Sequence, residues 1–263
     1  MVDIHTHIIF GVDDGSKDID MSVEIISKEY KYGLRDLFCT PHINSISELE
    51  DIPKMKENFN LLSERCKNMF PELNIYLGYE VGPSFKIADA IREKKVNLCL
   101  GNSRYILIGP FFSQMPDNMS DTLFDLQAAG FIPIIAHPER MDYYNKDPKI
   151  LEDYIKRDML FQVNVKSLIG DYGKRIQVFA EKLIDNNWVS FVSTDLHKPS
   201  KSSSIESGYE FISNRWNEDL AKKLLIENGK KIIADEDIVC FNWKEWKEPP
   251  KKLFKIFNLN RKY

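Results

Sequence analysis

The chain has 263 residues and a formal net charge of −4, with 43% hydrophobic and 29% charged residues. This composition is ordinary for a globular protein with a buried core, and it excludes collagen-like, disulfide-scaffold and disordered chains. The charge gives no reason to expect a nucleic-acid-binding surface. The four cysteines form no C-x-x-C pair, and no signal peptide precedes the first apolar run, so we expect a cytoplasmic protein.

Seven short apolar runs in the sequence predict buried β-strands. They are rich in Ile, Leu, Val, Phe and Tyr, which pack well in sheets. In chain order the predicted strands are Val2–Ile4, Leu34–Cys39, Asn74–Leu77, Tyr105–Ile108, Phe131–Ala136, Leu160–Val163 and Trp188–Val192.

Most of these runs are separated by segments whose apolar residues recur at three- and four-residue spacing, which predicts amphipathic helices. The first helix contains Ile19 and Tyr30, and we expect Ser16 to cap its start and Gly33 to end it in the left-handed conformation. Further helices are expected at residues 53–69, 84–94, 120–130, 148–157, 172–186, 205–213 and 217–228.

Strands that alternate with helices predict βαβ units and a parallel sheet. The residues after the strands decide between an open doubly wound sheet and a barrel. An open sheet concentrates functional groups at one switch point, whereas a barrel draws them from many strands around one end. Here polar residues follow nearly every strand. We therefore predict a single-domain α/β barrel of seven strands in residues 1–240, followed by a tail at 241–263.

All five histidines of the chain lie at or just beyond the ends of predicted strands. They are His5, His7, His42, His137 and His197. A lone histidine is more often a core or surface side chain than a ligand, but five around one end of a barrel indicate a metal site. Imidazole binds Zn, Mn and Fe, and carboxylates bind Mn and Mg. The carboxylates available nearby are Asp13, Asp14, Glu80 and Asp195.

Such a mixed site favours metal-assisted hydrolysis, which needs no Ser or Cys nucleophile. The sequence contains neither a G-x-S-x-G elbow nor a Cys-x5-Arg loop. Cations near the strand ends point to an anionic phosphoester, because guanidinium groups bind phosphate oxygens in a bidentate fork. Arg140 is the strongest candidate for binding the substrate phosphate. For Arg104, Lys198 and Lys201, a solvated surface charge is at least as good an explanation.

The ordered motifs of this sequence resemble the PHP (polymerase and histidinol phosphatase) superfamily. They are HTH at 5–7, VDDG at 12–15, TPH at 40–42, GYE at 78–80, HPER at 137–140 and TDLH at 194–197. More narrowly, the opening together with IIAHPER resembles the bacterial manganese-dependent protein-tyrosine phosphatases of capsule and exopolysaccharide clusters, from residue 1 to about 235. The resemblance implies a distorted seven-stranded β/α barrel that hydrolyses phosphotyrosine on a partner tyrosine kinase.

The resemblance also implies two or three divalent ions, with Mn²⁺ expected and Fe, Zn, Mg or Co as alternatives. The implied ligands are His5, His7, Glu80 and Asp195 for one ion, Glu80 and His137 for a second, and Asp14 or Asp13, His42 and His197 for a third. Arg140 resembles the phosphate-binding arginine of the family. His42 or His197 would assist proton transfer unless both bind metal.

Two departures from the family pattern leave other functions open. Gly109 stands where the family has an acidic residue, and Lys201 is the nearest cation where the family often has a second arginine. One alternative is a phosphoesterase for a small metabolite, for example histidinol phosphate. The other is a degenerate barrel that binds a kinase or a phosphorylated tail without catalysis.

The C-terminal tail differs in character from the rest of the chain. After Pro249 and Pro250, its last 13 residues mix basic and apolar side chains and contain no acid. This pattern fits a basic amphipathic helix that contacts an anionic membrane or a partner, and it also fits a terminal helix packed on the barrel.

Overall fold

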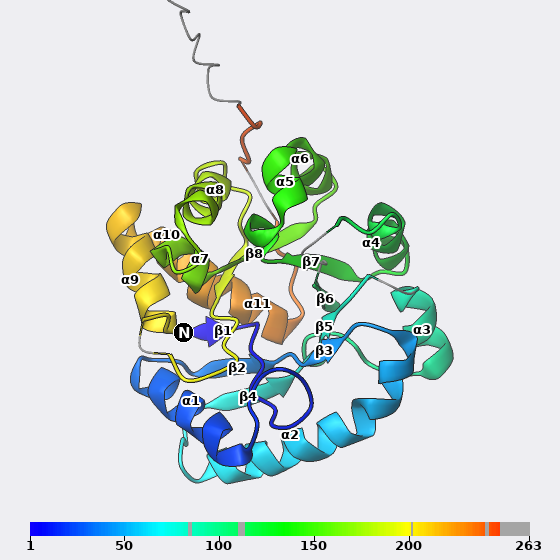
Figure 1. Ribbon diagram of the computed structural model, residues 1–263, viewed down its shortest axis with the longest axis vertical. Coiled ribbons are helices and arrows are strands. Elements are labelled where there is room, and N and C mark those ends of the chain that lie inside the picture. Colours follow the sequence, from blue (N-terminus) through cyan, green and yellow to red (C-terminus); the bar gives the residue numbers. More distant parts are fainter. Residues whose placement is uncertain (84–85, 110–113, 201, 240–241, 248–263) are drawn as a thin grey trace, which may run out of the picture.

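Nine short parallel strands lie at the centre of the part of the chain that the structure describes, and helices surround them (Figure 1). The structure is a computed structural model and describes residues 1–83, 86–109, 114–200, 202–239 and 242–247. One sheet has the order β1-β2-β4, from Val2–Asp3, Asp36–Cys39 and Asn74–Leu77. The other has the order β3-β5-β6-β7-β8-β9, from His42–Ile43, Glu80–Val81, Tyr105–Ile108, Ile132–Ala136, Leu160–Asn164 and Phe191–Ser193.

Each of the seven predicted strands is present, but together they do not form one closed seven-stranded sheet. The ladder between β2 and β4 stops at Cys39 and resumes between β3 and β5 at His42. Pro41 has no N–H to donate, and the N–H of Thr40 donates instead to the carbonyl of Thr6 at 2.8 Å. A bridge of one residue pair, Thr6 with Leu196, links the sheets at the other side. The fold is therefore mixed α/β with parallel sheets, and the expected closed barrel is not confirmed.

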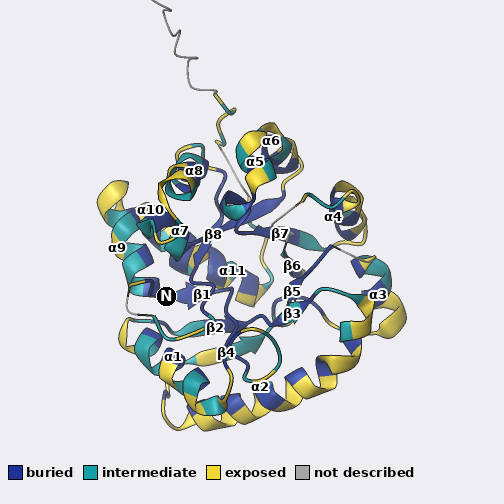
Figure 2. Cartoon of the chain, in the orientation of Figure 1, coloured by how far each residue is buried: buried dark blue, intermediate teal, exposed yellow. Residues whose placement is uncertain are grey.

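Strands from both sheets point alternate side chains into one central apolar cluster, as the period of two in a strand requires. The cluster contains Val2, Ile4, Phe38, Leu100, Tyr105, Leu107, Ile134, Ala136, Leu160, Phe191 and Ile232. The opposite faces of the strands pack against helices in a second, larger cluster. Figure 2 shows the resulting pattern, in which most strand residues are buried, β4 is only partly covered, and many exposed residues lie on the outer sides of the helices.

The helices follow the predicted pattern closely. They are α1 Ile19–Lys31, α2 Ile52–Lys67, α3 Ile87–Lys94, α4 Met119–Ala128, α5 Asp142–Lys146, α6 Lys149–Ile155, α7 Val165–Ile169, α8 Lys174–Asp185, α9 Ile205–Arg215, α10 Glu218–Lys222 and α11 Asn228–Ala234, with 3-10 turns η1 Ile46–Asp51 and η2 Pro138–Arg140 and a π turn η3 Lys223–Glu227. The prediction missed α5, α7 and α11. These helices have five to seven residues, too few to show a helical period.

The predicted cap of the first helix is wrong, although the predicted end is right. Asp18 caps α1, because its side chain accepts a hydrogen bond from the N–H of Met21 at 2.9 Å. Ser16 is buried, and its N–H donates to the carbonyl of His7 at 3.0 Å. Gly33 follows the helix with φ of 88°, the left-handed conformation that glycine adopts without strain.

The first residues of the tail pack against the rest of the chain without forming a helix. The indole N–H of Trp188 donates to the carbonyl of Lys244 at 2.8 Å, and Trp246 packs edge-on against Phe179 at 5.6 Å. The amphipathic helix expected beyond Pro250 lies outside the described residues. Within the described part, no helix is both long enough and apolar enough to cross a membrane.

Candidate metal centre

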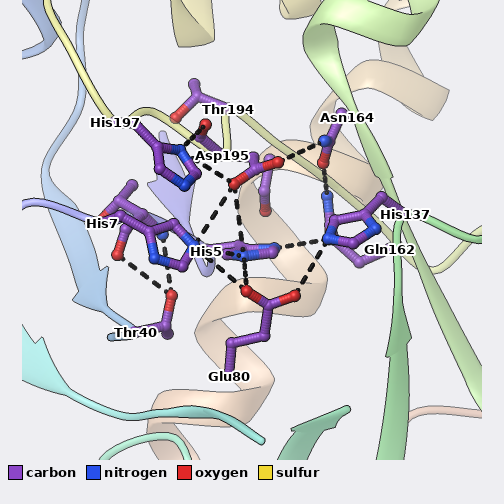
Figure 3. Close-up of polar contacts among 12 residues, drawn as sticks. His5, His7, Thr40, Glu80, His137, Gln162, Asn164, Thr194, Asp195 and His197 are labelled. Carbon is purple, nitrogen blue, oxygen red and sulfur yellow. Dashed lines mark hydrogen bonds and ion pairs between the residues drawn. The ribbon is translucent and has the colours of Figure 1, made fainter. Parts of the chain in front are cut away.

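The structure brings all five histidines together at the carboxyl ends of the strands, as the sequence predicted. Figure 3 shows His5, His7, His137 and His197 around Glu80 and Asp195. His5 and His7 follow β1, His42 begins β3, His137 follows β7, and His197 follows β9. Two residues at this end have backbone angles that side-chain-bearing residues rarely adopt, His137 with φ of 34° and Asp195 with φ of 53°. Such strain persists where the surrounding structure enforces it, and it is common at functional sites.

Four buried side chains form the inner group, which we define as His5, His7, Glu80 and Asp195. The Nε2 atoms of His5 and His7 lie 3.1 Å apart, and each is 3.2 Å from Oε2 of Glu80. Oδ1 of Asp195 lies 3.6 Å from the Nε2 atom of His5 and 3.4 Å from that of His7. The other carboxylate oxygen of Glu80, Oε1, lies 3.0 Å from Nε2 of His137. Glu80 therefore faces two sets of histidines at once.

A more exposed set adjoins the inner group, and we define this outer group as Asp14, His42 and His197. Oδ1 of Asp14 lies 3.4 Å from Nε2 of His42 and 3.3 Å from Nε2 of His197. The side chain of Asp14 is 70% exposed, whereas those of His42 and His197 are 30% and 26% exposed. The second ring nitrogen of His42, Nδ1, lies 3.1 Å from Oε2 of Glu80, so the two groups meet at this carboxylate.

Asp13 and Asp14, which the sequence leaves as equal candidates, have different surroundings. Asp13 accepts hydrogen bonds from Nδ1 of His7 at 2.8 Å and from the N–H of Gly15 at 2.9 Å. It thereby holds the His7 ring with Nε2 directed at the inner group. A carboxylate behind a histidine is the usual arrangement that orients a metal ligand. Asp14 instead directs its carboxylate at the histidines of the outer group.

A directional chain of hydrogen bonds supports the inner group from behind, and the sequence did not reveal it. Nδ1 of His5 donates to Oε1 of Gln162 at 2.9 Å, and Nε2 of Gln162 donates to Oδ1 of Asn164 at 2.8 Å. Nδ2 of Asn164 then donates to Oδ2 of Asp195 at 2.7 Å. The chain aims Nε2 of His5 and Oδ1 of Asp195 at the same point. Polar residues at the end of the otherwise apolar run LFQVN were the available signal.

The pKa shifts of the inner group show that its carboxylates are ionised and that the space between its side chains favours a cation. Burial alone would raise the pKa of the Glu80 carboxyl, but the charge of His5 and the hydrogen bonds from three histidines outweigh it and hold the pKa well below its ordinary value. Burial is likewise outweighed by histidines at Asp195, whose pKa is lowered to about 2. Burial would lower the pKa of His5 and His7, yet the neighbouring carboxylates raise both. The raised histidine pKa values reflect the negative potential of the two buried carboxylates, and the same potential would stabilise a divalent cation held between these groups.

The spacing of these atoms fits divalent ions. The ligand-type atoms of His5, His7 and Glu80 all lie within 4.8 Å of one another, as do those of His7, Asp14, His42 and His197. Ions such as Zn²⁺ bind nitrogen and oxygen at about 2.0–2.2 Å, which places neighbouring ligands roughly 3 Å apart. The mixed imidazole and carboxylate donors suit Mn, Fe or Zn. The residues present therefore fit a cluster of divalent ions.

Gly109 lies against the Glu80 side chain. A Cβ atom built at Gly109 would overlap Oε1 of Glu80 and would lie 2.7 Å from its Cδ and Cγ atoms. No side chain can therefore start at position 109 unless Glu80 moves. The Glu80 carboxylate takes up the space next to His137 in which an acidic residue at 109 would begin.

A cavity of about 440 Å³ opens over the two groups, and three cations are among the residues that line it. Nη1 of Arg140 donates to Oδ2 of Asp195 at 2.9 Å, and its guanidinium lies over the ring of Tyr172 at 4.4 Å. Lys166 and Lys198 also line the cavity. Burial lowers the pKa of the Lys166 ammonium, as expected for a cation partly removed from water. Neither Lys166 nor Tyr172 was a candidate in the sequence.

Arg104, a weaker candidate for binding the substrate phosphate, is not among the residues that line this cavity. Arg104 lies just before β6, at the amino ends of the strands, and its guanidinium pairs with Asp235 at 3.2 Å and Asp237 at 3.1 Å. Its assignment to the substrate phosphate is therefore wrong, because the amino and carboxyl ends of parallel strands lie on opposite sides of the fold. Lys201 lies outside the described residues.

Comparisons with known proteins agree with this geometry. Residues 1–234 match the model of a family described as capsular polysaccharide synthesis, CpsB/CapC. CapC of Staphylococcus aureus is 31% identical over 244 residues, covering 90% of this chain and 93% of CapC. The tyrosine-protein phosphatase YwqE of Bacillus subtilis is 27% identical, covering 98% of this chain and all of YwqE.

A solved structure also matches this chain. It comes from a crystallographic study of YwqE from Bacillus subtilis and CpsB from Streptococcus pneumoniae, described as unique metal-dependent tyrosine phosphatases. The TM-score is 0.86 at 26% identity, and the match covers 94% of this chain and all of the solved chain. The extent of the family match and the identity to CapC together show that this chain belongs to the CpsB/CapC family.

Proposed function

We propose that this protein is a metal-dependent protein-tyrosine phosphatase that acts on a bacterial tyrosine kinase controlling capsule or exopolysaccharide synthesis. The observation that carries the proposal is the convergence of five histidines and three carboxylates, Asp14, Glu80 and Asp195, beneath a cavity that cations also line. The phosphatases named among its relatives support the same substrate class.

The proposal assigns the inner group, the outer group and His137 as the ligands of two or three divalent ions, with Mn²⁺ as the expected metal. Ions held there would supply Lewis-acid activation of water and would neutralise charge on the phosphoryl oxygens. Glu80 is central to this assignment, because its two oxygens face different histidines. Asp13 acts by positioning His7 and is not a ligand in this proposal.

The protein's own residues then bind and orient the phosphoryl group. The hydrogen bond to Asp195 and the Tyr172 ring hold the Arg140 guanidinium at the edge of the metal centre. In this proposal the Arg140 guanidinium binds phosphoryl oxygens. His42 and His197 direct Nε2 at Asp14, which favours a role as ligands for both. Proton transfer to the leaving tyrosine oxygen then falls to water.

The proposal also covers the location of the protein, its substrate and a contact with the membrane. Cys39, Cys66 and Cys99 are buried free thiols, which fits a reducing cytoplasm. The phosphorylated tail of the partner kinase is proposed as the substrate because of the family resemblance.

Contact of residues 250–263 with an anionic membrane would bring enzyme and kinase together. Sedimentation with liposomes, with and without these residues, tests this contact. Equal pelleting of the two forms rules that contact out.

The function is tested by assaying the Mn²⁺-loaded protein against phosphotyrosine peptides and small phosphomonoesters, including histidinol phosphate. We expect a higher kcat/KM for the peptides. A strong preference for the small esters would replace the proposal by a metabolite phosphoesterase. A protein that holds its ions and binds phosphopeptide but hydrolyses neither would be the non-catalytic binding module.

A further inference from the structure

Lys166 is a partly buried cation whose charge the described residues leave unpaired. Its side chain lines the cavity over the metal centre. Among the residues that the structure describes, no carboxylate oxygen lies within 4.0 Å of its ammonium nitrogen, and no side-chain hydrogen bond is made to it. Removing an ammonium from water without a counter-ion costs free energy. An anion that enters the cavity would supply the missing partner.

The buried carboxylate of Glu139 links the two elements that carry Lys166 and Arg140. Oε1 of Glu139 accepts hydrogen bonds from the N–H of Asn164 at 2.9 Å and from the hydroxyl of Ser167 at 2.5 Å. Glu139 precedes Arg140 in η2, whereas Asn164 and Ser167 flank the start of α7, which carries Lys166. The two cations therefore stand on elements that are tied together directly behind the cavity.

The three cations that line the cavity differ in solvent exposure. Arg140 is 21% exposed and is already bonded to Asp195. Lys198 is exposed, so water screens its charge. Lys166 is intermediate, and its charge is screened less than that of Lys198. A phosphoryl group carries a charge of about −1.5 to −2 near neutral pH, and an ammonium binds it as a point charge.

We propose that Lys166 binds the phosphoryl group of the substrate together with Arg140. This inference rests on the proposed function for the identity of the substrate. The binding of phosphate itself does not depend on it. A lysine lacks the fork of an arginine, so Arg140 orients the phosphoryl group and Lys166 adds attraction.

The test uses the full-length, Mn²⁺-loaded protein and inorganic phosphate as the probe. Lys166→Met and Lys166→Gln remove the charge, Lys166→Arg keeps it, and Lys149→Met makes the same charge change at an exposed position of α6 outside the cavity. A hydrogen bond to a charged group is lost in the first two variants. Calorimetry should therefore show phosphate Kd raised at least about tenfold in both. Lys166→Arg and Lys149→Met should stay within about threefold of the natural protein.

Kinetics with a phosphotyrosine peptide separate binding from structure. Loss of Lys166 should raise KM in parallel with the phosphate Kd, while the number of bound ions and the melting temperature stay unchanged. The proposal is overturned if Lys166→Met and Lys166→Gln bind phosphate within twofold of the natural protein. Phosphate binding that depends on Lys166 in a protein unable to hydrolyse phosphotyrosine would overturn the proposed function and leave this inference standing.

Discussion

The inner and outer groups meet at Glu80 but differ in how the protein holds them. His5, His7, Glu80 and Asp195 are buried, and Gln162, Asn164 and Asp13 fix their orientations by hydrogen bonds. Asp14 is 70% exposed, and the two histidines beside it are only partly covered. Rigid support raises metal affinity because less ordering is needed on binding. The inner group should therefore hold its ion more tightly than the outer group.

The largest effect is expected for Glu80→Gln, because Glu80 faces both groups and His137. The change keeps the shape of the side chain but removes the negative charge that offsets several imidazoles. We expect kcat/KM to fall by at least roughly a thousandfold. Elemental analysis should show loss of ions from both groups. Full metal content in this variant would contradict the central place given to Glu80.

Gly109→Ala should weaken metal binding at the inner group although no proposed ligand is replaced. The added Cβ collides with the Glu80 carboxylate, which must move away from His5 and His137. A decrease in Mn²⁺ affinity of about 10- to 100-fold is expected, the range seen when support of a ligand is lost. For the same reason Gly109→Glu should lower Mn²⁺ binding and not improve it. Calorimetric titration of both variants checks this, and tighter binding in Gly109→Glu would show that Glu80 moves freely.

Asp14→Asn and Asp13→Asn form a matched pair that separates the two groups. Asp14→Asn should remove one ion per chain by emptying the outer group, with the inner ion retained. Asp13→Asn should keep the ion count at saturating metal but lower inner-group affinity by about tenfold or more, because the His7 ring is no longer oriented. Metal counting at high and low Mn²⁺ distinguishes the two. Identical behaviour would mean that the aspartates share one role.

As pH decreases, the metal affinity of the inner group should begin to fall at a higher pH than that of the outer group, each relative to its own value at high pH. Neighbouring carboxylates outweigh burial and raise the pKa of His5 and His7, whereas burial lowers the pKa of His197. Protons therefore compete with metal at the inner group at a higher pH, and its apparent affinity falls first as pH decreases. Titrations of Asp14→Asn, which isolates the inner group, between about pH 8 and pH 6 should show a steeper loss than the outer ion of the natural protein.

The smallest effect is expected for Arg104→Ala. The guanidinium pairs with Asp235 and Asp237 at the amino ends of the strands, and all three side chains are well exposed. Exposed ion pairs contribute little to stability, so we expect activity within about twofold and only a slight decrease in melting temperature. A large loss of activity would show that the ion pairs at the amino ends of the strands influence the metal centre at the carboxyl ends.

Most of the candidate ligand residues were readable from the sequence because they follow runs that must be buried. The spacing of His5 and His7, and the polar residues after β7 and β9, needed only strand periodicity and the rule that parallel strands end together. Arg104 was misassigned because it precedes a strand, and residues before and after a strand lie at opposite ends of a sheet. The short helix α7 carries no helical period, so Lys166 drew no attention.

Local patterns in the sequence predicted the strands, the longer helices, their order and the candidate metal-ligand residues, because burial and hydrogen bonding within each segment follow such patterns. Long-range contacts place Asp14 and not Asp13 at the outer group, leave no room for a side chain at position 109 and select the cations that line the cavity. Those outcomes depend on contacts such as Asp13 with His7, Glu80 with Gly109, and Glu139 with Asn164. The distance in each of these contacts is set by how whole strands and helices pair and pack. A local sequence pattern does not contain that information.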